Sequence, residues 1–181
     1  MIKIIAAVSK NGVIGFGSSN SIPWSYPEDT QFFRRMTLNS TIIMGANTFI
    51  SMGSKPLPKR RNIVITSSQK IGATGVETFP SVERALTTLD ERPEERHRLS
   101  AIYTTAPVWF IGGRGIYKEG LKYASQMYLT LIPEEVSENS LDEPVFFPWI
   151  DVKRWSLKSI APIENADGSE SKLEVAMWKS Y

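Results

Sequence analysis

The chain has 181 residues, and its 21 Lys and Arg against 19 Asp and Glu leave a formal net charge of +2. With 41% hydrophobic and 22% charged residues, it has the composition of a folded globular protein and not of a disordered one. The balanced charge gives no sign of a nucleic-acid partner, the absence of cysteine excludes disulfides and thiolate metal sites, and no apolar stretch approaches the roughly 18 residues of a membrane helix. We therefore expect one domain over residues 1–181, in the cytoplasm and without a nucleic-acid or membrane partner.

Short apolar runs along the chain predict strands, and helical patterns fall between them. Aliphatic runs over residues 2–8, 41–45, 62–66 and 108–112 are typical of strands buried on both faces. Apolar spacing predicts helices over 28–36 and 81–89, with Ser81 as the N-cap of the second. Residues 127–132 and 173–178 predict two more strands, and 165–168 predict the turn of an antiparallel edge hairpin. Strands alternating with helices predict an α/β domain with a mostly parallel sheet covered on both faces.

Several kinds of catalysis are excluded by missing signatures. The chain has no G-x-x-x-x-G-K-[ST], no G-x-G-x-x-G after a strand, no H-E-x-x-H and no G-x-S-x-G. The single histidine, His97, lies in a segment rich in acids and arginines and is expected at the surface. We therefore expect neither P-loop chemistry, nor serine-hydrolase chemistry, nor a metal site.

Two corners where a predicted strand runs into a helix are candidates for phosphate binding. In the first, residues 108–110 lead through Ile111 and a Gly-Gly pair to Arg114; in the second, residues 41–44 lead through Gly45 to Asn47 and Thr48. Glycines let the backbone approach a ligand, and the N–H groups of a helix start bind anions. Two such corners could hold the phosphates of a dinucleotide. The alternative is ordinary turn chemistry, with Asn47 or Thr48 serving only as caps.

A third feature is Asp29, which lies close after Pro23, Trp24 and Pro27 and one helical turn before Phe33. A carboxylate among aromatic rings is partly desolvated, which raises its pKa and suits either proton handling or a paired hydrogen bond to an amidine-like ligand edge. The alternative is an acid that only complements the helix dipole in the first turn.

In order and spacing, these residues closely resemble the dihydrofolate reductase family over nearly the whole chain. The residues and motifs that carry the resemblance are 12–15, 22–24 with Pro27 and Asp29, Phe32 and Phe33, 43–45 with Thr48 and Phe49, 56–58 with Arg60 and Asn62, 111–113 with Tyr117, and 128–130. The resemblance implies a single α/β domain with an eight-stranded, mostly parallel sheet, an antiparallel C-terminal edge strand and helices on both faces. It implies reduction of 7,8-dihydrofolate to tetrahydrofolate by hydride transfer from NADPH. A monomer is expected because no long apolar surface stripe stands out.

The resemblance also assigns a substrate site. Asp29 would bind the 2-amino and N3 edge of the pterin with support from the Thr130 hydroxyl, and Trp24 would hold a water nearby. The backbone of Ile5 and Ile111 would face the 4-oxo side, and Ala7 would line the pocket with Ile5. Phe33, Met52 and Leu57 would enclose the benzoyl ring, and Arg60 would bind the glutamate α-carboxylate. Arg60 could instead be a surface arginine beside Lys59 and Arg61.

For the cofactor, the resemblance implies a site at the two corners, a lid over residues 16–24 and a cis Gly112–Gly113 peptide. Its residues would be Ala7, Ile14, Gly15, Gly45, Ala46, Asn47, Thr48, Thr66, Ser67, Ser68, Ile111, Gly112, Gly113, Arg114, Gly115, Ile116 and Tyr117. Position 46 is Ala where many members carry an Arg for the 2′-phosphate of NADPH. The hydroxyls of residues 66–68 still match that site, and Arg114 or Lys70 could supply its charge.

Two other functions compete with this reading. A reductase of another pterin or pyrimidine would share the fold, but it would give Arg60 no carboxylate to bind. A non-catalytic nucleotide-binding descendant would keep the fold without turnover, but it would have no physical reason to retain a partly buried carboxylate such as Asp29.

Overall fold

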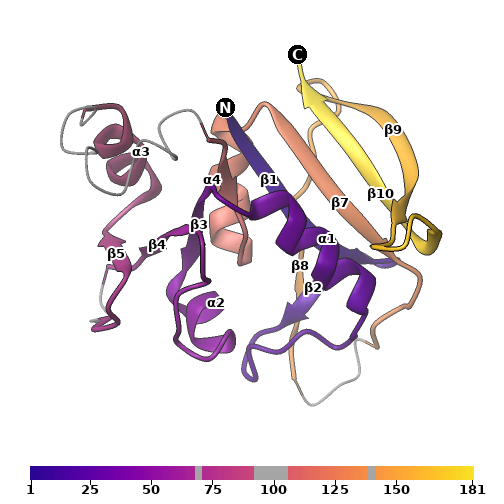
Figure 1. The fold of residues 1–181 in the computed structure, drawn as a ribbon, viewed down its shortest axis with the longest axis horizontal. Helices are drawn as coiled ribbons and strands as arrows, with labels where there is room; N and C mark the ends of the chain where they lie inside the picture. The colour runs from indigo at the N-terminus through magenta and orange to yellow at the C-terminus, as the bar shows by residue number, and fades with distance from the viewer. Residues whose placement is uncertain (68–70, 92–105, 138–141) are drawn as a thin grey trace.

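The computed structural model describes residues 1–67, 71–91, 106–137 and 142–181 (Figure 1). Ser68, Lys70 and His97 therefore lie outside the described residues. The elements in chain order are β1 (Ile2–Ser9), β2 (Val13–Phe16), α1 (Pro27–Thr37), β3 (Thr41–Gly45), α2 (Ala46–Ser51), β4 (Arg61–Ile65), β5 (Val76–Phe79), α3 (Val82–Glu91), β6 (Val108–Phe110), α4 (Arg114–Tyr123), β7 (Gln126–Ile132), β8 (Pro144–Phe146), β9 (Trp155–Glu164) and β10 (Glu170–Ser180). Every predicted strand and helix is present, and Ser81 caps α3 by accepting a hydrogen bond from the Arg84 N–H at 3.2 Å.

An eight-stranded sheet crosses the molecule in the order β5-β4-β3-β6-β1-β7-β10-β9 (Figure 1). The pairs from β5 through β7 are all parallel, and β10 is antiparallel to both of its neighbours. This confirms a mostly parallel sheet with an antiparallel C-terminal strand. The outermost position belongs to β9, the first strand of the predicted hairpin, and β10 lies one place further in. A separate two-stranded sheet joins β2 to β8.

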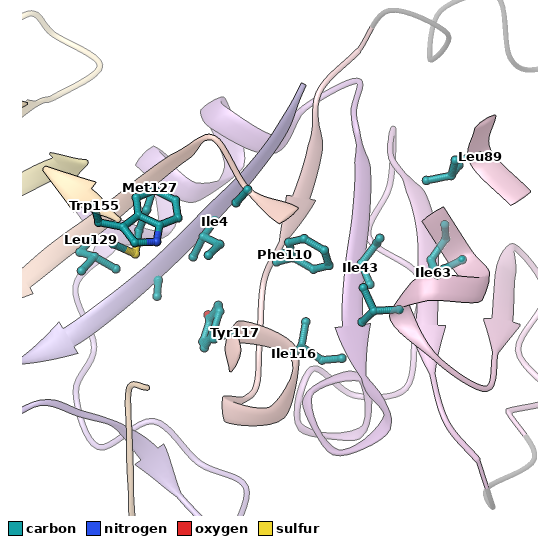
Figure 2. Close-up of a cluster of buried hydrophobic side chains, with 14 of the residues drawn as sticks. Ile4, Ile43, Ile63, Leu89, Phe110, Ile116, Tyr117, Met127, Leu129 and Trp155 are labelled. Atoms are coloured by element: carbon teal, nitrogen blue, oxygen red, sulfur yellow. The ribbon is translucent and has the colours of Figure 1, made fainter. Parts of the chain in front are cut away.

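The central strands of the sheet, such as β1, β3 and β4, are buried on both faces, which explains why they are apolar without alternation. On β1, Ile4 and Ala6 point into one core cluster while Ile5 points into the other. The first cluster receives side chains from α3 and α4, and the second receives Phe32 from α1 and Phe49 from α2. Figure 2 shows the first cluster, with Ile116 and Tyr117 of α4 near Phe110. Within the described part of the chain, no helix is long and apolar enough to span a membrane.

Gly120 in α4 makes the packing of this first cluster testable. Alanine in a helix interior is normally favoured over glycine by about 0.5–1 kcal/mol. A Cβ at position 120, however, would lie 2.8 Å from the Cδ2 atom of Phe110, whose side chain is 0% exposed. We expect Gly120→Ala to lower the free energy of unfolding by about 1–3 kcal/mol in urea denaturation. The control is Gly115→Ala in the same helix, where a Cβ meets nothing within 4 Å; equal losses in both variants would contradict this packing.

Candidate active site

Two adjoining cavities lie where the parallel strands β3, β4 and β6 end and α2 and α4 begin. The first has a volume of about 310 Å³ and the second about 450 Å³. Both are lined by Asn47 and Thr48 from α2, by Gly113, and by Arg114 from α4. The carboxyl edge of a parallel sheet is the place where ligands bind in open α/β folds.

The structure brings the predicted cofactor residues together around these cavities. The first cavity is lined by Ile14, Gly15, Ile111, Gly112 and Tyr117 in addition to the four shared residues, and the second by Gly45, Ala46, Thr66, Ser67, Gly115 and Ile116. Ala7 lines neither cavity and packs, partly buried, against the second core cluster. Ser68 cannot be placed, because it lies outside the described residues.

The two predicted corners are joined directly to each other. The N–H of Gly45 donates to the carbonyl oxygen of Gly112 at 2.8 Å. The Gly112–Gly113 peptide is cis, as the resemblance implies. Gly112 has φ +117°, and a Cβ there would lie 3.1 Å from the Tyr117 hydroxyl oxygen, so this position requires glycine. The Tyr117 hydroxyl donates to the Ile5 carbonyl at 3.1 Å, which ties the corner to the centre of the sheet.

The predicted substrate residues gather on the other side of β1 and β6, in the second core cluster. Ile5 and Ile111 are buried there, and the partly buried side chains of Trp24, Phe33, Met52 and Leu57 pack against this cluster. These residues come from β1, α1 and three loops, so the fold brings the predicted substrate residues together from distant segments. The Ile5 carbonyl, predicted to face the pterin, already accepts the hydrogen bond from Tyr117.

Asp29 lies in the first turn of α1, and its carboxyl is partly buried. Burial raises the pKa of this carboxyl; the nearby Thr130 hydroxyl opposes the rise, and the charge of Glu28 adds to it. Thr130 is 1% exposed, and its hydroxyl lies beside the Asp29 carboxyl. Asp29 lines neither cavity, but its charge adds to burial in raising the pKa of Tyr117, which lines the first cavity. A partly desolvated carboxylate beside a buried hydroxyl can bind a ligand edge that presents two N–H donors.

Arg60 follows Pro58 in the loop before β4 and is half-buried. Its guanidinium carbon lies 5.9 Å from the centre of the Phe33 ring. One terminal nitrogen donates to the Pro58 carbonyl at 2.9 Å, and the other donates to the Arg34 carbonyl at 3.3 Å. Arg60 is therefore held against a predicted pocket residue and is not an arginine extended into solvent.

The lid segment, residues 16–24, closes one side of the first cavity. Phe16, Gly17, Asn20, Ser21 and Ile22 all line this cavity. The carboxylate of Asp142 accepts hydrogen bonds from the backbone N–H groups of Ser18 at 2.8 Å and Ser19 at 2.9 Å, and also from the Ser18 hydroxyl. Hydrogen bonds from Ser18 and Ser19 hold the pKa of the Asp142 carboxyl well below its ordinary range. This carboxylate fixes the lid segment to the residues that precede β8.

Asp142→Ala tests whether this anchor shapes the first cavity. Without the three acceptor contacts, the lid segment should open more often, so NADPH should bind about 3- to 10-fold more weakly and cleavage within residues 16–22 should be faster. Cofactor titration by tryptophan fluorescence and limited proteolysis measure the two effects. The matched control is Asp167→Ala, which removes a carboxylate that accepts from the Ser169 N–H at 3.0 Å and the Ser169 hydroxyl at 2.6 Å in the β9–β10 turn. Identical behaviour of the two variants would contradict the anchor.

Some residues of this region had no signal in the sequence. Ser51 and Val145 line the first cavity, and Ile65 and Pro80 line the second, although none belongs to a recognisable motif. Asp142 contacts the lid segment only because β2 and β8 pair, and neither strand was predicted. The extent of most helices and strands was predictable from the sequence, but contacts between separate loops were not.

Comparison with known proteins identifies the family to which the chain belongs. A family model described as "Dihydrofolate reductase" matches residues 1–179. The chain belongs to the dihydrofolate reductase family. It is 43% identical to dihydrofolate reductase of Buchnera aphidicola over 75% of this chain and 74% of that protein. It is 34% identical to dihydrofolate reductase type 3 of Salmonella typhimurium over 85% of this chain and 86% of that protein.

The family is also evident in three dimensions. The structure of dihydrofolate reductase from Enterococcus faecalis in complex with NADP(H) matches with a TM-score of 0.79 and 28% identity, over 99% of this chain and 96% of that one. Both the eight-stranded sheet and the helices on its two faces are therefore those of the dihydrofolate reductase fold.

Proposed function

We propose that the protein reduces 7,8-dihydrofolate to 5,6,7,8-tetrahydrofolate with NADPH as the hydride donor. The observation that carries the proposal is a two-part cavity between two glycine corners, in a fold that also places a partly buried carboxylate, Asp29, beside Thr130. Membership of the dihydrofolate reductase family supports it. The cavities suit a dinucleotide, and the Asp29 pocket suits a flat ring with adjacent N–H donors.

The residues of the site act in two ways: they orient the substrate, and they supply an electrostatic field. NADPH, when bound, supplies the hydride from its nicotinamide ring. Asp29 binds the 2-amino and N3 edge of the pterin, the Thr130 hydroxyl supports this contact, and Trp24 holds a water nearby. The negative charge of Asp29 favours the pterin with N5 protonated, and water supplies that proton. The lid segment lines the first cavity and would shield the nicotinamide ring there from bulk water.

The second cavity suits the 2′-phosphate of NADPH although position 46 is Ala and not Arg. The hydroxyl residues Thr66 and Ser67 line it together with Arg114. Arg114 is exposed at the first position of α4, has no charge partner among the described residues, and faces no acidic residue in the first turn of its helix. We assign Arg114 as the cation that binds the cofactor phosphate there.

Arg114→Gln tests this assignment by direct binding. We expect the Kd of NADPH, measured by fluorescence titration, to rise about 10-fold while the Kd of NADH changes less than 2-fold, since only NADPH carries the 2′-phosphate. Lys118→Gln is the control, because Lys118 is exposed one turn further along α4 and lines neither cavity. Equal weakening of both cofactors would place Arg114 on the pyrophosphate instead, and no weakening would exclude it from the site.

An assay that follows the loss of absorbance at 340 nm tests the function itself. It is run with dihydrofolate and, in parallel, with NADPH or NADH. We expect rapid loss with NADPH. Loss with either cofactor at similar efficiency would keep the reductase and overturn the NADPH preference. No loss with either, from folded protein, would favour the non-catalytic descendant or a reductase of another pterin or pyrimidine.

The proposal includes a monomer in the cytoplasm that has no nucleic-acid partner. The net charge of +2 supports the last point. The location follows from the charges on folate and NADPH, which keep both molecules from crossing a membrane unaided. Light scattering of the purified protein tests the monomer, and a mass of twice the 20.3 kDa chain would overturn it.

A further inference from the structure

The terminal residue of α1, Thr37, contacts the guanidinium of Arg60 from a position that the proposed mechanism does not use. Thr37 is 0% exposed. Its hydroxyl donates to the Phe33 carbonyl at 2.8 Å and accepts from the Nε–H of Arg60 at 2.9 Å. One buried hydroxyl therefore joins the backbone of α1 to the side chain of a residue 23 positions later.

The contact fixes the orientation of the guanidinium and not only its position. The guanidinium is planar, so hydrogen bonds at three of its nitrogens determine its plane. Thr37 holds Nε, and the carbonyls of Pro58 and Arg34 hold the two terminal nitrogens. All three of these acceptors are neutral oxygen atoms.

Thr37 itself cannot turn away from Arg60 without losing its own hydrogen bond. Threonine in a helix commonly donates to the carbonyl four residues earlier, which uses the proton of the hydroxyl and aims its lone pairs outward. Here the donation to Phe33 leaves the Thr37 oxygen as an acceptor for Arg60. Phe33 also lies beneath the guanidinium, so the same helical turn supplies both the ring and the acceptor.

We propose that Thr37 is a positioning residue for substrate specificity, which holds Arg60 in the orientation that binds the glutamate α-carboxylate of folate. This inference rests on the proposed function, in which Arg60 makes that contact. A bidentate contact between arginine and a carboxylate depends on the plane of the guanidinium. Thr37 thus affects how well the glutamate tail is recognised and does not affect hydride transfer.

Thr37→Val tests the proposal, because valine keeps the shape of threonine and removes only the hydroxyl, with its contacts to Arg60 and to the Phe33 carbonyl. We expect the KM for dihydrofolate to rise about 10-fold with kcat unchanged, the pattern of lost ground-state binding. With 7,8-dihydropteroate, which lacks the glutamate, KM should be unchanged. Thr37→Ser, which keeps the hydroxyl, should restore the KM for dihydrofolate to within 2-fold of the original protein.

A matched control separates positioning from a general effect of the substitution. Thr87 in α3 makes the same bond to the carbonyl four residues earlier, Glu83, at 2.9 Å, and no contact to an arginine side chain is seen for it among the described residues. Thr87→Val should leave both KM values unchanged. Titration of folate and pteroate against intrinsic fluorescence gives the same comparison without turnover.

The outcomes distinguish the inference from the function on which it rests. If the KM values for dihydropteroate and dihydrofolate rise equally in Thr37→Val, the residue is merely structural and the inference is overturned. An unchanged KM for dihydrofolate in Thr37→Val also overturns it. If the unmodified protein reduces neither substrate, the proposed function fails, and the folate-to-pteroate binding ratio still decides whether Thr37 orients Arg60.

Discussion

Asp29→Asn is expected to fold normally and to lose about 10²- to 10³-fold in kcat at pH 7. Asparagine keeps the size of the side chain but removes the negative charge, and its amide cannot accept two N–H donors as a carboxylate does. The variant should therefore orient the pterin poorly and no longer favour protonation of N5. Single-turnover measurement of NADPH oxidation isolates this step from product release.

The same variant should be more stable than the original protein at neutral pH. The pKa of Asp29 is raised in the folded state by burial, so the folded protein holds this proton more tightly than the unfolded chain does. The stability associated with that proton is complete below the unfolded pKa, about 3.9, and is lost as the pH rises through the folded value. Asparagine is neutral throughout, so the Tm difference in favour of Asp29→Asn should grow from pH 4 to pH 7.

Either half of this result can fail on its own. Full activity of Asp29→Asn at pH 7 would remove Asp29 from the chemistry. A lower Tm at pH 7 with folded structure retained at pH 4 would mean that the carboxylate stabilises the fold, as an acid that complements the helix dipole does. The combination of lost turnover and gained stability is the mark of a carboxylate kept for function.

Arg60→Leu is expected to give the second large effect, a loss of substrate binding without a loss of turnover. Leucine keeps an apolar contact with Phe33 and removes the charge, so the KM for dihydrofolate should rise about 100-fold while kcat is retained. Dihydropteroate, without the glutamate, should be reduced as well as by the original protein. Steady-state kinetics with the two substrates measures the difference.

The neighbouring residue provides the control for Arg60. Arg61 is engaged with Glu77 at 2.6 Å and lies on β4 outside the predicted pocket. Arg61→Leu should leave both KM values within 2-fold. If Arg60→Leu leaves dihydrofolate binding unchanged, the glutamate contact is wrong, and a reductase of a pterin or pyrimidine without that tail becomes the better interpretation.

The sequence could predict features that depend on neighbouring residues or on a pattern that recurs along the chain. The buried strands were predictable because apolar runs such as 41–45 have no polar face to confuse their assignment, and the structure places that strand at the same residues. The two glycine corners were predictable because each lies where a strand ends and a helix begins. Asp29 stood out because an acid among aromatic residues is unusual.

What the sequence could not predict depends on partners far apart in the chain. β9 carries Pro162 and mostly exposed side chains, so it lacks the apolar pattern of a buried strand and forms only because β10 pairs with it. Asp142 and Thr37 belong to no motif; their roles come from Ser18, 124 positions away, and from Arg60, 23 positions away. The anchors of the lid segment and of Arg60 are therefore properties of the fold and not of any single segment.

Isotope transfer tests the central claim most directly. The protein is incubated with dihydrofolate and with NADPH that carries deuterium at both C4 positions, and the folate product is analysed by mass spectrometry. Direct hydride transfer predicts tetrahydrofolate that contains one deuterium, at C6, in water of natural isotopic composition. Tetrahydrofolate without deuterium, or no tetrahydrofolate from folded protein with both ligands bound, would contradict the proposed function.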